Sequence, residues 1–126
     1  MEDLNSISYK IIGCAYNVHR NLGPGLLEST YEACLIQEIL KNGLSVKQQV
    51  GLPLIYNGKK LEVGYRIDLL VEDKIIIEIK SVEAIIPIHK AQVLTYLKLS
   101  NHRIGLLINF NVVNLQDGIS RLINGY

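Results

Sequence analysis

Two carboxylates and one lysine are spaced along residues 68–80 so that a simple hairpin would bring them together. Asp68 precedes the polar run 72–74, and Glu78 and Lys80 follow it. If this run forms a three-residue turn, counting outward along both strands sets Asp68 opposite Glu78. Directly opposed residues lie on one face of a sheet with Cβ atoms about 4.5–5.5 Å apart. Lys80 shares that face because side chains alternate along a strand.

Such an acidic pair is suited to binding a divalent cation. Two like charges that oppose each other on a sheet repel, and a bound cation offsets the repulsion. Carboxylate oxygens with open positions for water suit Mg²⁺ or Mn²⁺. The ammonium of Lys80 could then stabilise negative charge on a phosphate or orient the attacking water. The chemistry indicated is metal-assisted hydrolysis of a phosphodiester.

The same alternation assigns the neighbouring apolar residues to faces. The face expected to form the core holds Ile67, Leu69, Val71, Ile75, Ile77 and Ile79. The charged face also carries Leu70 and Ile76, so we expect helices to cover both sides of the sheet. The alternative is a solvated outer face on which Lys80 and Glu78 form a salt bridge.

The N-terminal helical region offers two further candidates, Glu28 and His19. Glu28 falls in the first turn of a predicted helix, in line with Tyr31 and Leu35, which turns it toward the inner face. The alternative is a carboxylate favoured there by the helix dipole. His19 closes the preceding helix, where the dipole equally favours a histidine without any role as a ligand.

A later helix, opened by Pro87, presents a polar stripe. His89, Gln92 and Tyr96 recur on one side of it, and Gln92 and Tyr96 are one turn apart. Facing the sheet, this pair could hydrogen-bond a substrate phosphate or hold Lys80. The alternative is an ordinary surface stripe.

The periodicity predicts a single α/β domain over residues 1–126, with the order α-α-β-β-β-α-β and a mixed central sheet. A first helix covers Leu4–His19 and a second runs from Pro24 to about Asn42, where Gly43 ends it. Residues 109–126 stay open between an edge strand and a helical turn near Ile119–Ile123. The remaining elements are predicted at Val46–Tyr56, Lys59–Val71, Ile75–Lys80, Pro87–Ser100 and Ile104–Ile108, with a hairpin turn at Asn57–Gly58.

Composition and charge limit the kinds of partner and compartment that we expect for this protein. A net charge of +1 over 126 residues does not force a nucleic-acid or membrane partner, so any phosphate-binding surface would be local. Cys14 and Cys34 occupy apolar helical positions, which fits core packing in a reducing compartment. No apolar run approaches the roughly 20 residues of a membrane helix, and the start, Met1–Asp3, is acidic where a secretory signal is basic. We expect a cytoplasmic protein without a membrane partner.

Several of these residues also form motifs of a known family. Gly25–Tyr31 reads G-x-x-E-x-x-Y, Asp68 with 78–80 reads D…E-x-K, and Gln92–Tyr96 reads Q-x-x-x-Y. In this order they resemble the GxxExxY proteins of the PD-(D/E)xK nuclease superfamily, with the last motif similar to its RecB-like branch. The runs Val18–Gly25 and Leu106–Phe110 add to a resemblance that spans nearly the whole chain.

The resemblance implies a restriction-endonuclease-like core with a mixed central sheet flanked by helices. It implies that Glu28, Asp68 and Glu78 bind Mg²⁺ or Mn²⁺ and that Lys80 is the catalytic lysine. Gln92 and Tyr96 would support the site or contact nucleic acid. His19 matches a run rather than a defined ligand position. Ile67 stands where the superfamily motif has proline, and no catalytic position is lost.

Three functional hypotheses follow. The first is a metal-dependent nuclease acting on DNA, or alternatively on RNA. The second is a non-catalytic nucleic-acid-binding or assembly module that retains the fold, motivated by the small size and scattered basic residues. The third is a nuclease subunit that needs a homodimer or a partner chain to complete its groove.

Overall fold

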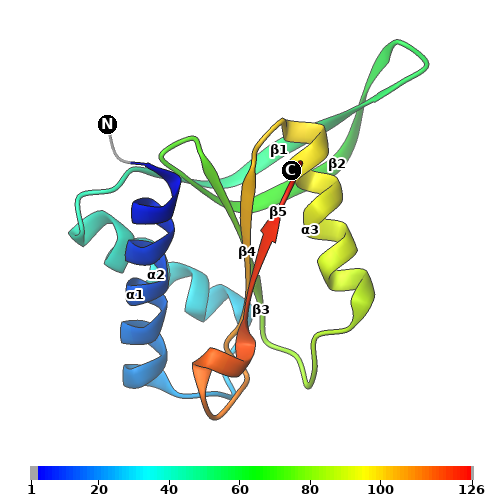
Figure 1. The fold of residues 1–126 in the computed structure, drawn as a ribbon. Coiled ribbons are helices and arrows are strands. Elements are labelled where there is room, and N and C mark those ends of the chain that lie inside the picture. Colours follow the sequence, from blue (N-terminus) through cyan, green and yellow to red (C-terminus); the bar gives the residue numbers. More distant parts are fainter. Residues whose placement is uncertain (1–2, 126) are drawn as a thin grey trace.

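The computed structural model describes residues 3–125, which form three α-helices, five strands and one short 3₁₀ helix (Figure 1). The elements in chain order are α1 (Leu4–Leu22), α2 (Glu28–Lys41), β1 (Val46–Tyr56), β2 (Lys59–Val71), β3 (Ile75–Lys80), α3 (Pro87–Ser100), β4 (Ile104–Asn109), η1 (Leu115–Gly118) and β5 (Ile119–Ile123).

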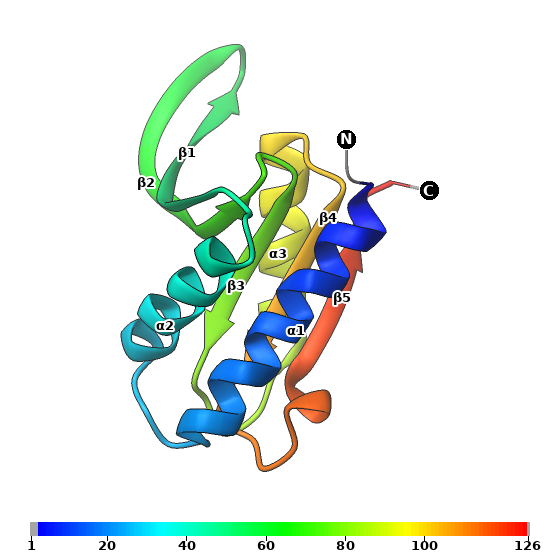
Figure 2. The same cartoon turned by 90° about the vertical axis from the view of Figure 1, so that its left-hand side faces the viewer.

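The strands form one sheet in the order β1-β2-β3-β4-β5. Only β3 and β4 are parallel, and α3 is the crossover between them, whereas the other neighbours are antiparallel. Helices α1 and α2 lie on one face of the sheet and α3 lies on the other (Figures 1 and 2). This mixed sheet flanked by helices is the predicted restriction-endonuclease-like α/β architecture, which is confirmed.

Each face of the sheet has its own apolar core. The core against α1 and α2 contains Leu69, Val71, Ile75, Ile77 and Ile79, as alternation predicted. The core against α3 is built around Leu70, Ile76, Val93, Leu97 and Leu107. The two buried faces explain why β3 has few exposed positions and reads as a nearly continuous apolar run.

The prediction for Ile67 was wrong. Ile67 is 1% exposed but packs in the core on the α3 side, together with Leu70 and Ile76. Two features disturb the alternation at this point. The β2–β3 pairing ends at Leu69, and the facing strand β1 has a positive φ of 51° at Gln49.

The N-terminal helices differ from their predicted bounds at the glycine-rich loop. Helix α1 continues past His19 to Leu22, and α2 begins at Glu28 instead of near Pro24. Gly23 and Gly25 have positive φ values of 69° and 96°, which glycine adopts without steric cost. The backbone therefore turns through this loop before α2 can start, and Pro24 is not in its first turn.

Turn chemistry identified the hairpins well. Asn57 and Gly58 both have positive φ, as the tight turn between β1 and β2 requires. The paired strands form an arm that extends away from the rest of the molecule (Figures 1 and 2). Near the C-terminus the strand alternative is confirmed for Ile119–Ile123, and the helical turn lies before it, at η1.

The cysteine prediction is consistent with the structure. Cys14 is buried in the core beneath α1, Cys34 is half-buried against it, and both are free thiols. None of the helices within residues 3–125 has the length and apolarity needed to cross a bilayer. Met1 and Glu2, on which the argument against a signal segment partly rested, lie outside the described residues.

Close packing of α3 on the sheet depends on Gly105 in β4. A Cβ atom there would lie 2.8 Å from Val93 Cγ1 and 3.3 Å from Leu97 Cδ1. We predict that Gly105→Ala lowers the free energy of unfolding by about 1–3 kcal/mol, because the buried Val93 cannot move aside freely. Urea denaturation measures this. Gly51→Ala, where the added Cβ meets no atom within 4 Å, is the control, and an equal effect of both changes would contradict the packing argument.

Candidate active site

Asp68 and Glu78 face each other where β2 and β3 stop pairing. The predicted register is confirmed, with Val71 opposite Ile75 and the last pair at Leu69 and Ile77. Beyond this pair, side-chain carboxylates accept the hydrogen bonds between the two strands in place of backbone carbonyls. The Asp68 N–H donates to Glu78 Oε1 at 3.2 Å, and the Ile79 N–H donates to Asp68 Oδ2 at 2.9 Å. Each carboxylate thus holds the backbone of the opposite strand.

Glu78 is the electrostatically unusual member of the pair. Alternation along β3 places it with Ile76, which packs in the core on the α3 side, and the residue is only 5% exposed. Burial, followed by the negative charge of Asp68, raises the pKa of Glu78 to about 8. The Asp68 N–H and the ammonium of Lys80 oppose this shift, and the charge of Glu28 adds to it. A cation near this carboxylate would therefore be strongly favoured.

Lys80 is held at the C-terminal end of β3. It is half-buried, pairs with Asn109 of β4 in the parallel ladder, and acts on Glu78 through its positive charge. The segment that follows is fixed by Asn109, which is 2% exposed. The Asn109 side chain accepts a hydrogen bond from the Val82 N–H and donates one to the Val82 carbonyl. The chain after Lys80 is therefore tied to the adjacent strand.

Tyr31 explains how α2 delivers Glu28 to this region. The fully buried ring stacks on Phe110, with centroids 4.6 Å apart. Its hydroxyl donates to the Gly23 carbonyl at 2.6 Å and accepts from the Leu26 N–H at 3.1 Å. Both ends of the glycine loop are therefore attached to one buried side chain. The loop fixes where α2 starts, and Glu28 is its first residue.

Contacts of Ser81 join this loop to the end of β3. The Ser81 hydroxyl donates to the Leu26 carbonyl at 2.6 Å, and its N–H donates to Glu28 Oε2 at 3.3 Å. Glu28 thus lies beside the residue that follows Lys80. Two observations support the expectation that Glu28 leans toward the strand carboxylates. One is this contact with Ser81, and the other is the effect of the Glu28 charge on the pKa of Glu78.

Gln92 and Tyr96 form the expected pair on α3. Gln92 Nε2 donates to the Tyr96 hydroxyl at 3.0 Å, and Tyr96 is 7% exposed. Burial raises the pKa of Tyr96, the hydrogen bond from Gln92 opposes this, and the charges of Glu78 and Asp68 add to it. The Tyr96 ring also lies near Tyr65 of β2, at 6.1 Å between centroids. His89, in the same stripe, instead accepts a hydrogen bond from the Ile86 N–H at the start of α3.

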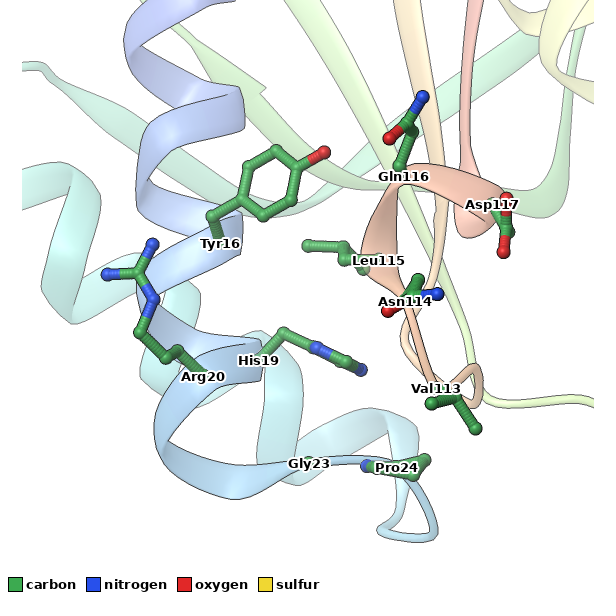
Figure 3. Close-up of a pocket in the computed structure, with 10 residues that line it drawn as sticks. All are labelled: Tyr16, His19, Arg20, Gly23, Pro24, Val113, Asn114, Leu115, Gln116 and Asp117. Carbon is green, nitrogen blue, oxygen red and sulfur yellow. The ribbon is translucent and has the colours of Figure 1, made fainter.

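His19 lies elsewhere. Its Nε2 is 2.7 Å from the Val112 carbonyl oxygen. The ring lines a cavity of about 570 Å³ between α1 and the segment 113–117, which Tyr16 and Arg20 of α1 also line (Figure 3). Within the described residues, the hydrogen bond of His19 joins it to Val112, just before this segment, and not to Asp68, Glu78 or Lys80.

Two polar residues near Asp68 were not identified from the sequence. Gln49 of β1 donates through Nε2 to Glu32 Oε2 at 2.9 Å and to Asp68 Oδ1 at 3.4 Å. Glu32 follows Glu28 by one helical turn, and that spacing was a usable signal. Gln49 has no such signal in the sequence, because its side-chain position depends on the positive φ of its own backbone, which no local sequence pattern indicates.

The donor set fits a hard divalent cation. Among residues 3–125 no group of three His, Cys, Asp or Glu side chains is arranged to hold a metal ion on its own. Mg²⁺, however, is commonly held by one or two carboxylates together with waters and substrate phosphates. The adjacent Asp68 and Glu78 meet that requirement, and the raised pKa of Glu78 shows that its ionised form lacks a compensating positive charge.

Comparison with known proteins agrees with this geometry. Residues 5–122 match the family model of the PD-(D/E)XK nuclease superfamily. The chain belongs to this superfamily. Nucleases of this superfamily typically use divalent metals.

A likeness to a solved structure concerns the fold alone. The crystal structure of SSO0001 superimposes with a TM-score of 0.58 at 23% sequence identity. The match covers 79% of this chain and 51% of the other, so the superfamily member described here spans about half the length of that relative. No curated protein matches the sequence.

The raised pKa of Glu78 predicts an unusual pH dependence of stability in metal-free buffer. Folded Glu78 keeps its proton up to about pH 8, whereas the unfolded chain releases it near the ordinary value of 4.5. The contribution of protonated Glu78 to the free energy of unfolding is therefore fully present below pH 4.5, falls as pH rises, and is lost above about pH 8. Urea midpoints measured with EDTA between pH 5 and 9 should decline more steeply for the wild type than for Glu78→Gln.

The matched control is Glu62→Gln on the exposed arm, which should retain the wild-type pH slope. If Glu78→Gln and the wild type decline in parallel, Glu78 is not protonated in the folded protein at neutral pH.

Proposed function

We propose that this protein is a Mg²⁺- or Mn²⁺-dependent nuclease that hydrolyses phosphodiester bonds in DNA. The observation that carries the proposal is the Asp68–Glu78 pair, placed where two strands diverge, with Lys80 beside it. A buried carboxylate next to a second carboxylate is costly without a cation. In a chain of the nuclease superfamily, that cost is best explained by metal binding.

Asp68 and Glu78 are the proposed ligands, with Glu28 approaching from the start of α2. When bound, the cation supplies Lewis-acid stabilisation of the phosphate and lowers the pKa of a coordinated water. The ammonium of Lys80 donates to the scissile phosphate or to the attacking water, which stabilises the developing negative charge. The burial of Glu78 limits water access and strengthens these charge interactions.

Gln92 and Tyr96 are proposed to support the site from α3. Their mutual hydrogen bond fixes both side chains on the side of α3 that faces the sheet, near the carboxylates. The Tyr96 hydroxyl is then a neutral group that can contact a phosphate oxygen. The G-x-x-E-x-x-Y motif supports a finer assignment to the GxxExxY proteins, and Q-x-x-x-Y supports the RecB-like branch, from which we propose DNA as the substrate.

His19 is proposed to act at a distance from the chemistry. Its bond to the Val112 carbonyl supports the segment that follows Phe110, on which Tyr31 stacks. Two free cysteines suit a reducing compartment, and we propose the cytoplasm as the place of action.

Lys80→Ala tests the catalytic part of the proposal. We predict metal-dependent cleavage of DNA by the wild type in Mn²⁺ and a loss of about 100-fold or more in the variant, as expected when one donor to the transition state is removed. Single-stranded DNA, double-stranded DNA and RNA should be compared in one assay. Lys98→Ala, an exposed lysine at the end of α3, should cleave like the wild type. Equal rates for Lys80→Ala and the wild type would eliminate the catalytic role.

Calorimetry of Mn²⁺ binding tests the metal site separately from turnover. Glu78→Ala should lose at least about tenfold in affinity, because a buried ligand is removed. The exposed Glu62→Ala is the matched control and should bind as the wild type does. Identical binding by Glu78→Ala and the wild type would remove the proposed metal site whatever the cleavage assay shows.

A second candidate function is a non-catalytic nucleic-acid-binding or assembly module that retains the nuclease fold. The absence of a three-ligand cluster within residues 3–125 favours it. Strongly salt-dependent DNA binding without cleavage would support this alternative. A related possibility is a homodimer or a partner subunit that completes the groove, because a core of this size has little surface for recognising a substrate. Light scattering of the purified protein distinguishes a monomer from a dimer.

A further inference from the structure

Gln49 occupies a strained position in β1, directly across from Asp68. Its φ is 51°, in the left-handed region that residues other than glycine rarely adopt. The β1–β2 pairing joins Gln48 to Leu69 and Val50 to Ile67, and it passes over the pair in between, Gln49 and Asp68. Strained backbone conformations of this kind persist where the surrounding structure enforces them, often at functional sites.

The strained backbone sends the Gln49 side chain toward two carboxylates. Nε2 lies 2.9 Å from Glu32 Oε2 and 3.4 Å from Asp68 Oδ1. Ionised carboxylates only accept hydrogen bonds, so the NH₂ end of the amide must be the end that faces them. One of its two hydrogens can point at Glu32, whose Oε1 also lies 3.4 Å from Nε2, and the other at Asp68. Gln49 is therefore a bridge between α2 and β2.

The bridge completes the hydrogen bonding of Asp68. One carboxylate oxygen accepts from the Ile79 N–H at 2.9 Å, and the other accepts from Gln49. Donors from two different strands fix the plane of the carboxylate. Because an amide is neutral, it orients Asp68 without cancelling the negative charge that a cation requires, which a lysine or arginine at this position would do.

We propose that Gln49 is a positioning residue that orients Asp68 for metal binding, and that Glu32 anchors Gln49 to α2. The inference rests on the proposed metal-dependent function but adds two residues that neither the superfamily motifs nor the sequence patterns identified. Neither residue needs to touch the substrate. Their effect reaches the metal through the orientation of the Asp68 carboxylate, as is typical of residues that hold metal ligands.

Two substitutions at Gln49 separate the amide from the backbone strain. Gln49→Ala and Gln49→Gly both remove the amide, but only glycine relaxes the positive φ. Both variants should bind Mn²⁺ about tenfold more weakly than the wild type in calorimetry. The glycine variant should melt about 4 °C higher than the alanine variant in metal-free buffer. Gln48→Ala, the exposed neighbour whose backbone pairs with Leu69, should retain wild-type Mn²⁺ affinity.

Kinetics give a second readout. In both Gln49 variants the Mn²⁺ concentration for half-maximal cleavage should rise about tenfold, with the rate at saturating Mn²⁺ within about threefold of the wild type. A merely structural role predicts instead that Mn²⁺ affinity follows the melting temperature, so that Gln49→Gly binds better than Gln49→Ala. That result, or unchanged affinity in both variants, would overturn the inference.

Glu32 is tested by a conservative rescue. Glu32→Gln keeps an oxygen acceptor for the Gln49 amide, whereas Glu32→Ala removes it. Glu32→Gln should bind Mn²⁺ within about threefold of the wild type, and Glu32→Ala should resemble Gln49→Ala. An equal loss in both Glu32 variants would mean that Glu32 acts through its charge, which contradicts the anchoring role.

Failure of this inference can be distinguished from failure of the proposed function. If the wild type binds Mn²⁺ and cleaves DNA while the Gln49 variants do the same, only the positioning role is rejected. If the wild type neither binds Mn²⁺ nor cleaves, the proposed function is rejected, and the positioning role falls with it.

Discussion

The structure depends on two carboxylates that replace the backbone ladder where β2 and β3 part. Asp68 and Glu78 each accept an N–H from the opposite strand, so neither backbone is left with an unpaired donor. The same arrangement brings two negative charges together in a buried place, which raises the pKa of Glu78 to about 8. Pairing these N–H groups therefore places Asp68 and Glu78 where ionisation of both is unfavourable, and a bound cation would offset this repulsion.

The surrounding elements either keep the two carboxylates close together in a buried place or bring further groups near them. Helix α3 packs on the sheet face that holds Ile76, with Gly105 allowing the close approach. Tyr31 fixes the glycine loop so that α2 starts at Glu28, near the end of β3. The motif residues therefore have different tasks. Glycine and tyrosine shape the loop, and the glutamate between them contributes its charge to the site.

Much of the fold could be predicted because its signals are local. Positive φ at Asn57 and Gly58 follows from their residue types, and the hairpin fixed the register of the pairs next to it, from Tyr56 opposite Lys59 to Leu54 opposite Leu61. The start of α2 was predicted too early, since the Tyr31 hydroxyl contacts that hold the loop join residues the sequence does not show to be neighbours. Ile67 was assigned to the wrong face because strict alternation fails beside a strained residue on another strand.

The sequence by itself predicted that Asp68 and Glu78 lie close together, because one short turn sets the strand register, and the hydrogen bonds between their carboxylates and the opposite backbone agree. Tertiary structure alone decided the properties of that group. Burial and the charge of Asp68 fixed the pKa of Glu78, and the packing of α2 brought Glu32 to Gln49. His19, which the resemblance supported only through a run of residues, bonds to the Val112 carbonyl instead. Charge and register are properties of a strand pair, whereas desolvation and contacts between distant segments exist only once the layers have packed.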